Sequence, residues 1–67
     1  MATSREIGKA LIAANDGAIL ATVAQICRLT GFGRTYLTEV VNGLRTVGGK
    51  KTYFLPEVAD RLYERGM

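Results

Sequence analysis

The stretch "RLTGFGRTYLTEVVNG", residues 28–43, places two glycines between two runs with helical spacing. Gly31 follows a short run with helical spacing, and glycine takes the left-handed conformation that ends a helix without steric cost. After Gly33, apolar residues recur at i, i+3, i+4 and i+7, the spacing of one helix face: Leu37, Val40, Val41 and Leu44. The stretch therefore predicts two short helices joined by a glycine turn.

Two capping-box spacings mark where helices begin. Thr3 precedes Glu6 at the start of a helix predicted over 4–14, and Thr22 precedes Gln25 at the start of one predicted over 23–29. The apolar residues expected on their buried faces are Ile7, Ala10, Leu11 and Ala14 in the first helix, and Ile26 and Cys27 in the second. The run "AILA" between the two helices reads as a short extended connector or a one-strand fragment.

Beyond Gly43, the segment "LRTVGGKKTYF" predicts two short strands around a two-residue Gly-Gly turn. In that register Val47 faces Lys50 and Leu44 faces Tyr53. Lys51 would join Lys50 at the tip of the hairpin. Lysines there either protect a strand edge from aggregation or contact phosphate groups, and the local sequence favours neither over the other.

Pro56 suits the first turn of a last helix, predicted over 56–65 with Gly66 at its end. Its buried side would carry Val58, Ala59 and Leu62, and the rings of Phe32, Tyr53, Phe54 and Tyr63 are expected in the core or at its rim. The fold class is thus mostly α with a small β-hairpin. We expect one domain over 1–67, with a helix-turn-helix at about 22–43, a hairpin at about 44–54 and the C-terminal helix.

Composition excludes several kinds of chemistry. The 67 residues contain no His and a single Cys, so an internal disulfide, the usual zinc-ligand sets and nucleophiles activated by His are all excluded. We therefore expect no enzyme activity, no metal and no cofactor. With 48% hydrophobic residues the chain can bury a core. Its apolar runs are too short to span a membrane and its N-terminus lacks a signal-peptide pattern, which favours a cytoplasmic location.

The polar face of the third predicted helix is unusual for a solvated helix. It carries short side chains rather than the long Lys and Glu residues that exposed helix faces favour, and short hydrogen-bonding groups suit close approach to another surface. The net charge of +3 has the sign expected of a nucleic-acid binder, although many small domains carry that charge for solubility.

The segment "TVAQICRLTGFGRTYLTEVV" resembles the helix-turn-helix of bacterial transcription regulators, most closely the MerR-like and excisionase-like winged group of bacterial or phage regulators. The following "VGGKKTYFLPEVADRL" resembles the wing of that group and the helix after it. The resemblance covers about residues 22–62. The chain departs from the group in two respects. It has an additional N-terminal helix, which general winged-helix regulators also have, and it has Cys27 at a position where alanine is usual.

This resemblance implies a winged helix-turn-helix that binds double-stranded DNA, with the N-terminal half of the third helix in the major groove. Arg34 could then pair with guanine. Glu39 could accept a hydrogen bond from cytosine, or its carboxylate could disfavour wrong docking when it faces the phosphate backbone. Tyr36 would lie toward phosphate, and the hairpin lysines would contact a phosphate row. The full set of expected DNA contacts is Arg34, Thr35, Tyr36, Thr38, Glu39, Asn42, Lys50 and Lys51.

Two classes of function are therefore expected. The first is sequence-specific DNA binding, as a small transcription regulator or an excisionase-like recombination directionality factor. Because one such module covers only about 600–1,000 Å² of protein surface, a homodimer or a cooperative multimer on DNA is expected. The alternative is a protein-interaction module that docks a regulator or a recombinase through the same helix face.

Overall fold

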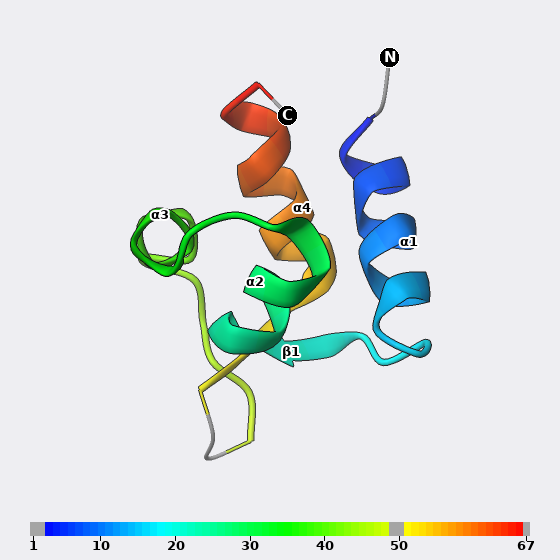
Figure 1. Cartoon of the computed structure of the whole chain (residues 1–67), viewed down its shortest axis with the longest axis horizontal. Helices are drawn as coiled ribbons and strands as arrows, with labels where there is room; N and C mark the ends of the chain where they lie inside the picture. Colours follow the sequence, from blue (N-terminus) through cyan, green and yellow to red (C-terminus); the bar gives the residue numbers. More distant parts are fainter. Residues whose placement is uncertain (1–2, 49–50, 67) are drawn as a thin grey trace.

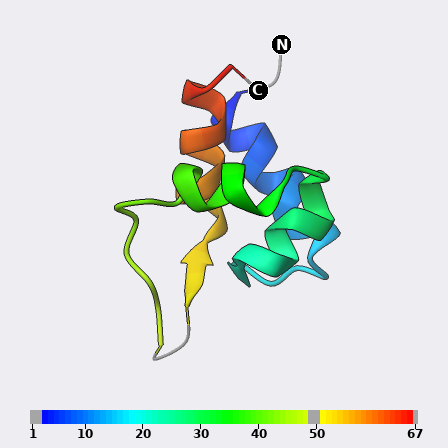
Figure 2. The same cartoon turned by 60° about the vertical axis from the view of Figure 1, so that its left-hand side comes forward.

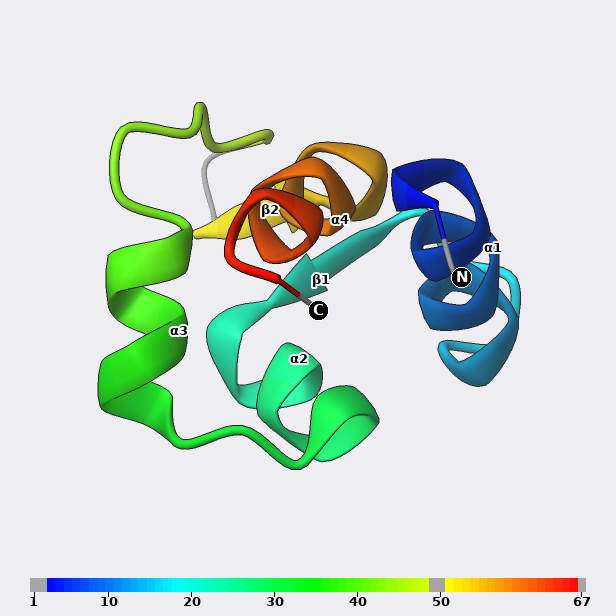
Figure 3. The same cartoon turned by 90° about the horizontal axis from the view of Figure 1, so that it is seen from above.

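The structure is a computed structural model that describes residues 3–48 and 51–66. Its elements, in chain order, are α1 (Ser4–Ala14), β1 (Leu20–Thr22), α2 (Val23–Thr30), α3 (Arg34–Val40), β2 (Thr52–Phe54) and α4 (Leu55–Glu64). The fold is mostly helical with a small antiparallel sheet, which confirms the expected fold class. The α1 and α3 helices lie at opposite ends of the molecule, with α2 and α4 between them (Figure 1, Figure 3).

The α1 helix begins where the capping box predicted, because Thr3 Oγ1 accepts a hydrogen bond from the backbone N–H of Glu6 at 3.3 Å. Its buried face, however, differs from the prediction. Ile7 and Leu11 are buried, but the other two expected residues, Ala10 and Ala14, are exposed. Gly8 is buried in their place.

Gly8 faces Ala59 of α4 in this packing. A Cβ atom built on Gly8 would lie 3.5 Å from the Cβ of Ala59, which is an ordinary van der Waals distance, so the contact does not require a glycine. The larger side chains of Ile7 and Leu11 gain more from burial than alanines do, and the helix turns them toward α4 at the expense of the alanine side.

The α2 helix starts and ends as predicted. Thr22 and Gln25 form a reciprocal capping box: the Gln25 N–H donates to Thr22 Oγ1 at 3.2 Å, and the Thr22 N–H donates to Gln25 Oε1 at 2.8 Å. Gly31 ends the helix with a φ of 78°, in the left-handed region. Ile26 is fully buried, whereas Cys27 is only half-buried, so the expectation of a buried Cys27 is met in part.

Replacing Gly31 by valine is expected to destabilise the fold by about 1–3 kcal/mol, because a β-branched residue is strained at positive φ. No atom lies within 4 Å of a Cβ built at this position, so the cost arises from the backbone alone. Gly31→Asn is the matched control, since asparagine tolerates this conformation. Thermal melting of the two variants measures the difference, and equal melting temperatures would contradict the assigned turn.

The α3 helix is shorter than the apolar spacing suggested. Leu37, Val40 and Val41 are buried as predicted, but the helix ends at Val40 and Leu44 lies beyond it, half-buried. Gly43 causes this early end, since its φ of 88° turns the chain away from the helical path. Leu44 nevertheless packs against the core from the segment that follows.

The two strands that pair with each other lie far apart in the sequence. The β1 strand runs antiparallel to β2, with Leu20 opposite Phe54 and Ala21 opposite Tyr53. Thr52 pairs with Thr22 in this ladder and with Val47 through an isolated bridge. Of the two alternatives predicted around 18–21, an extended connector or a one-strand fragment, the structure shows a strand, and the sequence did not reveal its partner.

The hairpin predicted after α3 has a different register. The bridge joins Val47 to Thr52, so the prediction that Val47 faces Lys50 and Leu44 faces Tyr53 is wrong. The register is set by β1, which holds Thr52 and Tyr53 in the ladder. We call residues 44–54 the wing; its described segments run away from the helices (Figure 2), and Gly49 and Lys50 lie outside the described residues.

The α4 helix starts one residue before Pro56, and its buried residues include Val58, Ala59 and Leu62 as predicted. Leu55 joins them and donates its N–H to the carbonyl of Ile19 at 2.9 Å. The aromatic rings follow the prediction with one exception: Phe32, Tyr53 and Phe54 are half-buried, but Tyr63 is 43% exposed. Tyr63 is thus a surface residue rather than part of the core rim.

Candidate nucleic-acid interface

The outward face of α3 is polar and exposed. Thr35 and Glu39 lie one turn apart on it, and both side chains are exposed. Arg34 and Thr38 are also exposed, on the flank of α3 that faces the wing. These four side chains, predicted as DNA contacts, therefore share one continuous helix surface at an end of the molecule (Figure 3).

Thr38 is the most constrained of these four. Its Oγ1 donates a hydrogen bond to the backbone carbonyl of Arg34 at 2.8 Å, which uses its single hydrogen. The oxygen still has lone pairs available to accept. Thr38 could therefore receive a hydrogen bond from an amino group of a base, whereas donating to a phosphate oxygen would require it to give up its bond to Arg34.

Tyr36 lies on the flank of α3 away from the wing. Its half-buried ring makes an edge contact with Phe32, with ring centroids 5.2 Å apart. The guanidinium of Arg65, at the end of α4, lies 5.6 Å from the centre of the Tyr36 ring. These two contacts give the Tyr36 ring a structural role beside the turn. The contact of Tyr36 with phosphate stays a prediction.

Asn42 occupies the turn after α3, where its side chain is exposed. Its backbone carbonyl accepts a hydrogen bond from Arg61 Nη1 at 3.1 Å. Arg61 lies in α4 and Arg65 directly follows it, one turn later, so this end of the chain contacts α3 at Tyr36 and the turn just past α3 at Asn42. These contacts add to the packing of Leu37, Val40 and Val41 in the core, which holds α3 against the body of the protein.

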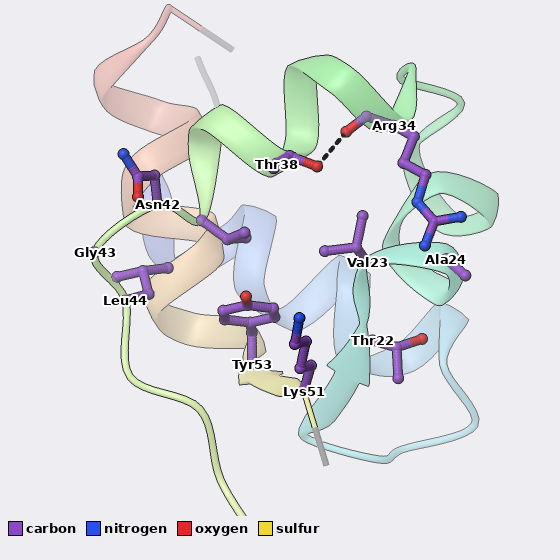
Figure 4. Close-up of a pocket in the computed structure, with 11 residues that line it drawn as sticks. Thr22, Val23, Ala24, Arg34, Thr38, Asn42, Gly43, Leu44, Lys51 and Tyr53 are labelled. Atoms are coloured by element: carbon purple, nitrogen blue, oxygen red, sulfur yellow. Dashed lines mark hydrogen bonds between the residues drawn. The ribbon is translucent and has the colours of Figure 1, made fainter.

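A groove of about 400 Å³ lies beside α3 (Figure 4). One wall is the flank of α3 with Arg34 and Thr38, the second is the start of α2, and the third is the wing with Lys51 and Tyr53. In Figure 4 the Arg34 side chain reaches along the start of α2, and Lys51 and Tyr53 extend from the wing toward α3. The described residues that line the groove include no carboxylate.

The positive charges beside α3 are not neutralised within the protein. In residues 3–48 and 51–66 the structure contains one ion pair, between Arg45 Nε and Glu57 Oε1 at 3.7 Å. Neither Arg34 nor Lys51 has an ionic partner among these residues, and both side chains are exposed. Lys50, which was predicted to act with Lys51, lies outside the described residues.

Sequence reasoning missed two residues that shape this region. Tyr53 was assigned to the core rim, which its half-buried ring confirms, but its hydroxyl also faces the groove (Figure 4). Arg61 was not singled out from the sequence, because its contact with Asn42 depends on how α4 approaches the end of α3. The alternation of Thr52, Tyr53 and Phe54 along a strand could have indicated that Tyr53 faces the same side as Lys51.

Other kinds of site find no support in the described part of the chain. Its Cys, Asp and Glu residues form no cluster of three that could hold a metal ion. None of its helices combines the length and apolar character needed to cross a membrane. Comparison with known proteins gives no match to a family model, a curated protein or a solved structure.

Proposed function

We propose that the protein binds double-stranded DNA in a sequence-specific manner, as a small transcription regulator or an excisionase-like recombination directionality factor. The observation that carries the proposal is the exposed polar face of α3 beside two cations, Arg34 and Lys51, that have no carboxylate partner in the described residues. Phosphate groups would supply the missing negative charge. A DNA-binding regulator of this kind would act in the cytoplasm.

In this proposal α3 enters the major groove, which is about 12 Å wide and accepts a helix. Thr35, Thr38 and Glu39 then face the base edges, and the Glu39 carboxylate can accept a hydrogen bond from cytosine N4. Asn42 contacts DNA from the turn that follows. The helix has seven residues and is about 10 Å long, so one copy reads few base pairs and useful specificity requires two or more copies on adjacent half-sites.

The decisive experiment measures binding to random-sequence duplex DNA at several salt concentrations. Binding releases the salt cations that surround the DNA phosphates, and this release becomes less favourable as the salt concentration rises. A DNA-binding protein therefore loses affinity steeply with increasing salt. If no binding occurs even at low salt, the DNA proposal fails. The exposed face of α3 would then be the docking surface of a protein-interaction module.

Glu39 offers a sharper test of how α3 is oriented. If its carboxylate points into the major groove, it is repelled by the phosphates of any duplex that does not offer it a hydrogen-bond donor. Glu39→Gln is therefore expected to bind random duplexes several-fold more tightly and to discriminate less between sequences. Competition between a selected site and random DNA measures both effects, with Glu64→Gln on α4 as the matched control. Unchanged discrimination would place Glu39 away from the bases.

A further inference from the structure

The groove between α3, the start of α2 and the wing is lined by three residues that carry hydrogen-bond donors. Arg34 belongs to the α3 wall and reaches down beside Ala24, and Lys51 extends from the wing on the opposite wall (Figure 4). Tyr53 stands beside Lys51, with its ring packed against the core and its hydroxyl facing α3. The two cations are exposed and have no ionic partner in the described residues.

The composition of the walls indicates what kind of group fits. Two cations and a phenol hydroxyl are donors suited to an oxyanion, and no carboxylate among the described lining residues competes for them. The rest of the lining is partly apolar, with Val23, Val41 and Leu44. Apolar side chains can cover the carbon atoms of a sugar, so a sugar joined to phosphate suits this groove better than a small free anion does.

We propose that the groove holds a backbone phosphate of the DNA strand with its attached sugar, and that Arg34, Lys51 and the Tyr53 hydroxyl donate hydrogen bonds to the phosphate oxygens. This inference rests on the proposed DNA binding and deepens it. It assigns Arg34 to the phosphate backbone instead of to guanine, and it adds Tyr53 to the DNA-contacting residues. Bases are then read by the other exposed side chains of α3, which are Thr35, Thr38 and Glu39.

The test compares affinity for random-sequence duplex DNA over a series of salt concentrations. Arg34→Ala and Lys51→Ala should each lower the slope of log affinity against log salt by about one unit, since each removes one phosphate contact. Tyr53→Phe should weaken binding about ten- to a hundredfold, the effect of losing one hydrogen bond to a charged group. Its slope should stay unchanged because no charge is lost.

Lys9→Ala is the matched control for charge. Lys9 is exposed on α1, which lies at the opposite end of the molecule from α3 (Figure 3), and its loss should leave the slope as it is. Tyr53→Phe keeps the ring that packs against the core, so its melting temperature should equal that of the wild type. A binding defect without a melting defect separates the hydroxyl's contact from its packing.

Several outcomes would overturn the inference. If Arg34→Ala loses affinity only for a selected site and binds random duplexes normally, Arg34 reads a base. If Tyr53→Phe binds as the wild type does, the hydroxyl contacts no phosphate. If the wild type binds DNA and the three variants bind it equally well, the groove assignment alone is refuted. If the wild type itself does not bind DNA, the DNA-binding proposal on which the assignment rests is refuted.

Discussion

Replacing Leu37 by alanine is expected to lower the free energy of unfolding by about 2–5 kcal/mol, the cost of removing a large buried side chain and leaving a cavity. Leu37 is fully buried in the core, and it belongs to a helix of seven residues that is too short to be stable without packing. Chemical denaturation of the variant and the wild type measures the change.

The neighbouring variant Thr35→Ala provides the control. Thr35 lies on the same helix with its side chain exposed, and alanine has the higher helix propensity, so this change should be nearly neutral or slightly stabilising. A near-neutral result for Leu37→Ala would mean that α3 is rotated about its axis. The exposed face proposed to read DNA would then be misassigned as well.

Removing both wing lysines is expected to have the largest effect on binding. The variant with Lys50→Ala and Lys51→Ala should lose affinity for all duplexes by a similar factor, on the order of a hundredfold at low salt, and the salt slope should fall by about two units. Lys51 is exposed beside the groove, and the part played by Lys50 is predicted from the sequence alone. Fluorescence anisotropy with labelled duplexes measures both quantities.

A double variant of α1, Arg5→Ala with Lys9→Ala, removes the same charge from the opposite end of the molecule. Its salt slope should match that of the wild type. If the wing variant and this control weaken binding equally, the effect comes from net charge and the wing makes no local contact. Were only some sequences to lose affinity, the lysines would contribute to base recognition.

Local signals in the sequence predicted helix boundaries well. The Thr3–Glu6 spacing and the Thr22–Gln25 capping box fixed the first residues of α1 and α2, because each cap is made by residues within four positions of one another. Gly31 fixed the end of α2 for the same reason. Such interactions are decided before the chain folds back on itself, so a single sequence contains them.

Features that depend on distant residues were predicted less well. The Gly-Gly pair suggested a two-residue turn, but β2 pairs with β1 and so sets which residue Val47 can reach. The buried face of α1 is set by Ile7 and Leu11, which pack into the core in place of the alanines, and helical spacing alone does not distinguish between the two sets. Both errors arise where tertiary packing overrides a local preference.

The candidate site divides in the same way. The exposed face of α3 was read correctly from helical periodicity, since burial of Leu37, Val40 and Val41 requires the polar residues to face outward. The groove was not foreseen, because its walls come from three separate elements. A tyrosine assigned to the core rim gives no sign, in the sequence, of where its hydroxyl emerges.

The pairing of Val47 with Thr52 separates the tip of the wing from the rest of the fold. The Val47 N–H donates to the Thr52 carbonyl at 3.0 Å, and Thr52 Oγ1 donates to the Val47 carbonyl at 2.7 Å. Residues inserted between these two positions would lengthen a closed loop at a cost of only about 0.6 kcal/mol per doubling of its length, while β2 and α3 keep their places. In a DNA-binding role, such insertions would change how far this loop extends along the duplex while the α3 residues that read bases stay in place, so overall affinity and sequence preference could change independently.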